Sequence, residues 1–197
     1  MLANCCRWIK NPLCPCGQTD MIRIDTCLLL GATGVGKTLL LKRLQRFSRH
    51  GFDELEALPS TLPTVGTNLI DISLKRRKKV TLRELGGCMS SIWPSYYSDA
   101  SSVIFMVDAS NTSQVSSSCI QLLSVLAAEP LQDVSVLLIF NKRDIPCLMS
   151  LIEIKSLFRL EDIITSATQS ITTMELSASS GQGLQEVLTW LESVTVK

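Results

Sequence analysis

The sequence GATGVGKT at residues 31–38 decides how this chain folds. It matches the pattern G-x-x-x-x-G-K-[ST], in which the backbone N–H groups of a glycine-rich loop curl around phosphate oxygens. An apolar strand, residues 22–30, precedes the stretch, and a helix through about residue 47 follows it. Because the motif requires this strand–loop–helix context, the stretch predicts a phosphate-binding loop.

Each residue type in the loop has a chemical role. Lys37 is expected to place its charge on the β and γ phosphates, and the Thr38 hydroxyl is expected to ligate Mg²⁺. The following helix directs its positive N-terminus at the anion. The predicted phosphate-binding residues are Gly31, Ala32, Thr33, Gly34, Val35, Gly36, Lys37 and Thr38.

Outward from the loop, short strands alternate with helices. Strands are expected at residues 68–74, 80–85, 103–107, 134–140 and 173–176, and helices at 114–128, 151–160 and 183–194. The runs VIFMV and VSVLLIF are continuously apolar, which suits strands buried on both faces. The sequence therefore predicts an α/β fold, with a mostly parallel six-stranded sheet and helices on both faces. In such sheets ligands bind at the carboxyl ends of the strands.

The sequence NKRD follows the last of those apolar runs and selects the base. The Asp144 carboxylate can accept two hydrogen bonds from N1 and N2 of guanine, a pair that adenine does not offer. Asn141 is expected to brace the loop, and the Lys142 stem to lie over the base. Ser177 and Ala178 follow the last expected strand, and they resemble a known loop in which the backbone N–H of the alanine meets the guanine carbonyl oxygen.

Over residues 22–194 the chain resembles the ADP-ribosylation-factor-like (Arf-like) branch of the Ras superfamily of small GTPases. The resemblance rests on PTVGTN at 63–68, LGG at 85–87, WPSYY at 93–97 and NKRDIP at 141–146. It implies a P-loop small-GTPase fold with GTP, GDP and Mg²⁺ as cofactors. Thr64 is then expected to close on Mg²⁺, and the Gly87 N–H to touch the γ-phosphate.

The resemblance also implies partners. Effector proteins would bind through the switch I and switch II segments in the GTP-bound state, and an exchange factor and a GTPase-activating protein (GAP) would drive the cycle. Loss of the γ-phosphate would release both segments.

Two residues depart from the family pattern within the stretch RELGGC at 83–88, which is unusual in the branch. Glu84 stands where an Asp usually holds Mg²⁺ through a water, and the same role is expected of Glu84. Cys88 stands where a Gln usually orients the attacking water, and a thiol is a weak hydrogen-bonding group. A redox or nucleophilic role for Cys88 has no evident base to support it. Hydrolysis is therefore expected to be slow or partner-dependent; the alternative is an active, GAP-dependent GTPase controlling membrane traffic.

Length and charge point to one soluble domain. The chain has 197 residues and a net charge of +1, which gives no indication of nucleic-acid binding. Residues 21–197 are expected to form the GTPase domain, and residues 1–20 an N-terminal extension. No N-myristoylation or prenylation signal is present. A cytoplasmic monomer with little or no membrane contact is expected.

Three further features leave alternatives open. Cys5, Cys6, Cys14 and Cys16 suit a flexible tail, S-palmitoylation or Zn²⁺ binding. The basic segment at residues 75–79 suits a solvated hairpin tip or a contact for anionic lipid or an acidic partner. The aromatic residues of WPSYY suit an exposed effector patch or partial burial under switch II.

Overall fold

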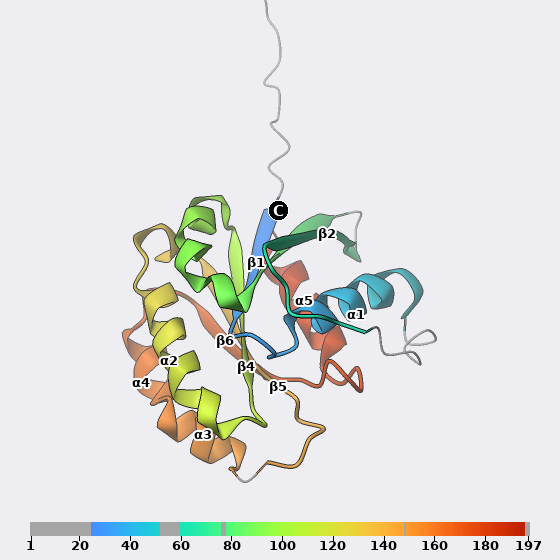
Figure 1. Cartoon of the computed structure of the whole chain (residues 1–197). Coiled ribbons are helices and arrows are strands. Elements are labelled where there is room, and N and C mark those ends of the chain that lie inside the picture. The colour runs from blue at the N-terminus through green and yellow to red at the C-terminus, as the bar shows by residue number, and fades with distance from the viewer. Residues whose placement is uncertain (1–24, 52–59, 76–77, 148, 196–197) are drawn as a thin grey trace, which may run out of the picture.

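Six strands form one sheet in a computed structural model that describes residues 25–51, 60–75, 78–147 and 149–195 (Figure 1). The sheet order is β2-β3-β1-β4-β5-β6, with only the β2–β3 pair antiparallel. The strands are β1 Asp25–Gly31, β2 Thr67–Ser73, β3 Lys79–Leu85, β4 Ser102–Asp108, β5 Ser135–Asn141 and β6 Ile171–Glu175. The predicted mostly parallel sheet is confirmed.

Helices cover both faces of this sheet (Figure 1). They are α1 Lys37–His50, η3 Gly87–Asp99, α2 Thr112–Leu126, η4 Glu129–Leu131, α3 Leu151–Leu157, α4 Leu160–Ser166 and α5 Leu184–Val194. Helices α1 and α5 pack on one face, and η3, α2, α3 and α4 on the other. Among the residues that the structure describes, no helix is long and apolar enough to cross a lipid bilayer.

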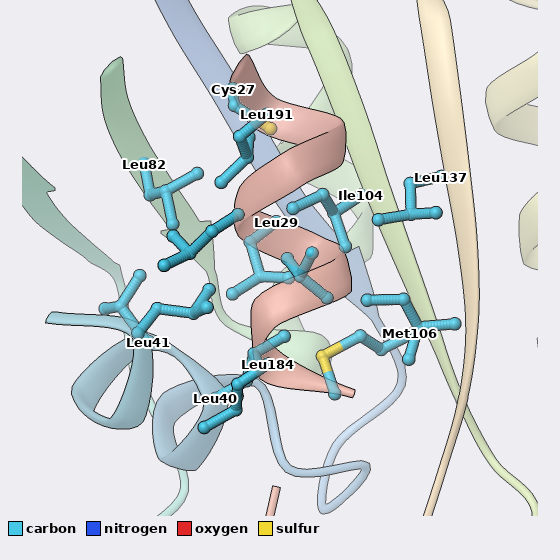
Figure 2. Packing of buried hydrophobic residues seen from close by; sticks show 14 of the residues in the cluster. Cys27, Leu29, Leu40, Leu41, Leu82, Ile104, Met106, Leu137, Leu184 and Leu191 are labelled. Carbon is cyan, nitrogen blue, oxygen red and sulfur yellow. The ribbon is translucent and has the colours of Figure 1, made fainter. Parts of the chain in front are cut away.

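The two faces of β1 explain its unbroken apolar sequence. Cys27 and Leu29 point into the cluster formed with α1 and α5, while Leu28 and Leu30 point into the opposite cluster. All four side chains are fully buried. Figure 2 shows the first cluster, in which Cys27 lies beside Leu191 of α5. Because successive strand residues face opposite sides, a strand covered on both sides needs apolar residues at every position.

The expected helix at residues 151–160 is wrong in its extent. The chain forms two short helices, α3 and α4, separated by Arg159 in the left-handed conformation with φ 49°. Leu160 and Ile163 of α4 are buried, so packing against the sheet continues beyond the break. Helix α4 and the helical turns of η3 and η4 were not predicted. The other elements match the expected ones to within a few residues.

Candidate functional site

A cavity of about 260 Å³ lies at the carboxyl end of β1, between the glycine-rich loop, the start of α1 and the segment before β2. It is lined by Thr33, Gly34, Gly36, Lys37, Thr38, Leu39, Thr61, Leu62, Pro63, Thr64, Glu84 and Gly87. The fold therefore gathers most of the predicted phosphate and metal residues around one hollow. Gly31, Ala32 and Val35 belong to the same glycine-rich loop, but they are buried and do not line the cavity.

Lys37 opens α1 and bends back over the loop. Its Nζ donates to the carbonyl oxygens of Gly31 and Ala32, at 2.7 and 2.8 Å. The side chain is almost wholly buried, and burial lowers the pKa of Lys37 to about 8, although the Glu84 carboxylate acts in the opposite direction. The ammonium is thus fixed to the loop whose N–H groups would hold phosphate.

Thr38, Thr64 and Glu84 come from three different segments and meet at one point. Thr38 Oγ1 lies 2.9 Å from Thr64 Oγ1. Glu84 Oε1 accepts hydrogen bonds from Thr38 Oγ1 at 2.5 Å and from Thr64 Oγ1 at 3.2 Å. These are hard oxygen donors, the class that Mg²⁺ prefers. The residues present therefore fit the Mg²⁺ that the sequence predicts.

Gly87 follows β3 and presses directly on the phosphate loop. A Cβ at this position would lie 2.3 Å from the Thr33 nitrogen and 2.5 Å from the Ala32 carbonyl carbon, so only glycine fits. This close approach places the backbone of residue 87 where a terminal phosphate on the loop would meet it. The neighbouring Cys88 is exposed, and its Sγ lies 3.7 Å from the Thr64 carbonyl oxygen.

Asn141 braces two loops with one buried side chain. Its Nδ2 donates to the Val35 carbonyl at 2.7 Å, and its Oδ1 accepts from the Ala178 N–H at 3.0 Å. Gly36 makes room for it, because a Cβ there would lie 2.5 Å from Asn141 Nδ2. The bracing role expected of Asn141 is present, and it joins the phosphate loop to the segment after β6.

Lys142 and Asp144 extend from the same turn in different directions. Lys142 has a positive φ of 66°, and its Nζ lies 2.6 Å from the buried carboxylate of Asp108. Asp144 is exposed, and its Oδ1 accepts a hydrogen bond from Ser177 Oγ at 2.6 Å. The Ser177 contact orients the carboxylate that is expected to read guanine. The structure thus brings the predicted base-reading residues together at the carboxyl ends of β5 and β6.

Three residues at the site escaped the sequence prediction. Asp108, the last residue of β4, forms an ion pair with Lys142. Asn68 of β2 donates a side-chain hydrogen bond to the Glu84 carboxylate. Arg43 of α1, fully buried, donates to the carbonyl of Ser179 beyond the base loop. Asp108 had a detectable signal, since it is a carboxylate at the end of an apolar strand. The other two depend on contacts between distant segments.

The aromatic segment after β3 is largely buried. Trp93 and Tyr97 are 2% and 5% exposed, while Tyr96 lies under the Arg83 guanidinium at 5.2 Å. Burial is therefore the correct alternative for Trp93 and Tyr97, which belong to the core cluster that also contains Phe105 of β4. Trp93 Nε1 also donates to the Gly86 carbonyl at 3.1 Å.

The basic hairpin contacts α5 through its described lysines. Lys75 Nζ lies 4.0 Å from Glu192, and Lys78 Nζ donates to the Thr195 carbonyl at 3.1 Å. The side chain of Lys75 is nevertheless 74% exposed, so a solvated tip stays a valid description of it. The cysteines at residues 5–16 and the acidic residues at 53–56 lie outside the described residues.

Comparisons with known proteins agree on one family. The ADP-ribosylation factor family model matches residues 18–195. ADP-ribosylation factor-like protein 16 of Homo sapiens is 59% identical over 168 residues, which covers 85% of this chain and 84% of the relative. ADP-ribosylation factor-like protein 1 of Saccharomyces cerevisiae is 34% identical and covers 90% of each chain. The resemblance to the Arf-like branch seen in the sequence is confirmed.

Solved structures share the fold. The Arl6 small GTPase of Trypanosoma brucei, solved with the nucleotide analogue GppNp, superposes with a TM-score of 0.72 at 20% identity and covers 87% of this chain and 96% of its own. The mammalian SRP receptor structure gives a TM-score of 0.70 at 22% identity, covering 86% and 100%. The P-loop small-GTPase architecture is thereby established.

Proposed function

The chain belongs to the ADP-ribosylation factor family of small GTPases, which bind guanine nucleotide, and on that premise we propose that it is a GTP/GDP-binding switch that recruits effector proteins when GTP is bound. One observation carries the proposal. Thr64 of the segment before β2 and Gly87 after β3 both close on the loop at residues 31–38. These two segments, switch I (residues 60–66) and switch II (Gly86 and η3), are therefore built to respond to the phosphates.

Each group at the site has a defined part in this function. Lys37 and the loop N–H groups would hold the β and γ phosphates, and Thr38, Thr64 and Glu84 would hold Mg²⁺, which would neutralise the phosphate charge. Asp144 would accept hydrogen bonds from guanine, and the Ala178 N–H would face its carbonyl. Loss of the γ-phosphate would remove the contact that keeps Gly87 and Thr64 in place.

Hydrolysis is proposed to be slow or partner-dependent because of Cys88. Catalysis in this reaction consists of positioning and electrostatic stabilisation, so a group must hold the attacking water in line with the γ-phosphate. A thiol on a single carbon has neither the reach nor the hydrogen-bonding strength of a carboxamide. An exchange factor, and a GAP that also orients water, would then set the state of the switch.

Localisation is proposed to be cytoplasmic, with a minor membrane-associated pool that depends on residues 1–20. The support is sequence composition, because Cys5, Cys6, Trp8 and Ile9 are the plausible anchor. Comparison of membrane fractions from the full chain and from a chain that begins at Met21 tests this. Equal membrane binding by both chains would contradict the N-terminal anchor, and the basic hairpin at residues 75–79 would become the candidate membrane contact.

Trp93 offers a direct test of the switch. Its indole N–H donates to the Gly86 carbonyl, so movement of switch II changes its surroundings. Exchange of GDP for GppNHp should change tryptophan fluorescence in the wild type. Trp93→Phe removes this reporter and leaves two tryptophans as internal controls, Trp8 and Trp190, of which Trp190 is buried on α5. Binding of both nucleotides without a fluorescence change, or tight ATP binding in competition with GTP, would contradict the proposal.

A further inference from the structure

The three oxygens at the proposed metal site lie within hydrogen-bond distance of one another, and their arrangement suggests more than the role expected of Glu84. The edges of the triangle formed by Thr38 Oγ1, Thr64 Oγ1 and Glu84 Oε1 measure 2.9, 2.5 and 3.2 Å. All three oxygens face the cavity at the phosphate loop. The Glu84 side chain is 1% exposed, so its carboxylate is committed to these partners.

This triangle has the size of one face of a magnesium octahedron. Octahedral Mg²⁺ binds oxygen at about 2.1 Å, which places neighbouring ligands about 3.0 Å apart. A carboxylate that acts through a water lies a full shell farther out, about 4 Å or more from the ion. A carboxylate in that position can also accept hydrogen bonds from hydroxyls that bind the metal, as Glu84 Oε1 accepts them from Thr38 and Thr64, so the number of waters on the metal distinguishes the two arrangements. Glu84 has one methylene more than Asp, and this extra length lets its carboxylate reach the proposed metal position.

Asn68 holds the other end of the same carboxylate. It stands directly opposite Glu84 in the antiparallel β2–β3 pair, and its Nδ2 donates to Glu84 Oε2 at 2.8 Å. With Oε2 engaged, the carboxylate cannot turn freely, and Oε1 is aimed at the two hydroxyls. A cross-strand pair thus fixes the direction in which the acidic group presents its free oxygen.

We propose that Glu84 is a direct ligand of the nucleotide-bound Mg²⁺, replacing a water that the ion would otherwise keep, and that Asn68 is the residue that positions it. This inference rests on the proposed function, since it concerns the same nucleotide site. It distinguishes this chain from relatives in which an Asp acts through a water. The metal is then held by a facial set of three protein oxygens.

The number of waters on the metal tests the proposal directly. Mn²⁺ replaces Mg²⁺ as a paramagnetic probe, and the purified protein is loaded with Mn²⁺ and GppNHp. In ¹⁷O-labelled water, each water bound to the ion broadens the electron paramagnetic resonance lines of Mn²⁺. The extent of the broadening therefore gives the number of coordinated waters. Glu84→Asp retracts the carboxylate by one methylene and should admit an additional water. The matched control is Glu186→Asp, an exposed residue of α5 remote from the metal.

The wild type and Glu186→Asp should show one water fewer than Glu84→Asp. Equal counts in all three proteins would overturn the proposal while leaving the nucleotide switch intact. Failure of the wild type to bind Mn²⁺ and GppNHp at all would instead contradict the proposed function, so the two failures are distinguishable.

Asn68→Ala tests the positioning role with the same readout. Without the amide the carboxylate is free to rotate, and the water count should rise towards that of Glu84→Asp. Thr67→Ala, at the adjacent exposed position of β2, should keep the wild-type count. A wild-type count in Asn68→Ala would show that Asn68 has no part in directing Glu84.

Discussion

Base selection is proposed to depend on Asp144. Its carboxylate is exposed beside Ser177 and is expected to accept hydrogen bonds from N1 and N2 of guanine. Asp144→Asn should weaken GTP binding by about 10- to 100-fold, since hydrogen bonds to charged groups contribute about 1.5–3 kcal/mol. The variant should bind xanthine nucleotides more tightly than the wild type does, because xanthine has a carbonyl where guanine has its amino group and the new amide can donate to it. Competition binding measures both effects, and Asp162→Asn on α4 is the control. Unchanged preference would remove Asp144 from the base site.

Cys88 is proposed to leave GTP hydrolysis slow, because it stands where a water-orienting Gln is usual. Unassisted small GTPases hydrolyse GTP at roughly 10⁻⁴ per second even with a Gln. The wild type should be at or below that rate, because the Cys88 thiol cannot hold the water. Cys88→Gln should be faster, at least with a GAP, while GTP affinity stays nearly the same. Single-turnover hydrolysis checks this.

The matched control for the hydrolysis measurement is Cys88→Ala. This variant removes the sulfur without adding a carboxamide, so its rate should equal that of the wild type. A wild-type rate well above about 10⁻² per second without any partner, compared with the scale above, would mean that another group orients the water. Glu84 would then be the first residue to test.

At the scale of elements, the break between α3 and α4 carries a measurable strain. Arg159 adopts the left-handed conformation, which costs a non-glycine residue about 1–2 kcal/mol. Its ion pair with Asp162 is highly exposed, so losing it matters little. Arg159→Gly should therefore raise the free energy of unfolding by up to about 1 kcal/mol. Urea unfolding measures the change.

Ser156→Gly is the control for that experiment. Ser156 lies exposed inside α3, where glycine is expected to destabilise the helix by about 0.5–1 kcal/mol. Replacement by glycine should thus raise the free energy of unfolding at residue 159 and lower it at residue 156. A destabilised Arg159→Gly protein would show that the arginine side chain matters more than its backbone conformation.

Local motifs predicted the strands and the nucleotide loops because their signals are short in range. The apolar run before the loop and the NKRD sequence each act within a few residues. Helix α4 was missed because the break at Arg159 is imposed by packing: a charged residue takes a conformation typical of glycine so that Leu160 and Ile163 can reach the sheet. Asn68 was missed because its role exists only through the β2–β3 register. Contacts of this kind follow from the assembled fold.

At the scale of the whole molecule, the buried Cys27 thiol makes the free energy of unfolding depend on pH. Burial raises the pKa of this thiol from 9.0 to about 12. Below pH 9 the thiol stays protonated in both the folded and the unfolded chain. Between pH 9 and the raised value only the unfolded chain loses the proton, so stability falls as pH rises. The slope from this group alone is about 1.4 kcal/mol per pH unit.

Cys27→Ala isolates that contribution. From pH 8 to pH 10 the wild type should lose about 1.4 kcal/mol more stability than the variant, by the same relation. The smaller side chain lowers stability equally at both pH values, so the difference between the two proteins cancels that cost. Urea unfolding at the two pH values measures it. Parallel losses in both proteins would mean that the thiol ionises in the folded state as readily as in the unfolded one.

Asn141, the buried amide between Val35 and Ala178, makes the nucleotide a bivalent ligand. The phosphates and the base dock on separate loops, and a fixed spacing lets the second contact form at a high effective concentration once the first is made. If that spacing could vary, each end would bind as an independent weak ligand. The affinity of the proposed switch for a whole nucleotide should therefore depend on the spacing that Asn141 fixes, and free guanosine or inorganic phosphate should bind far more weakly than their covalent union.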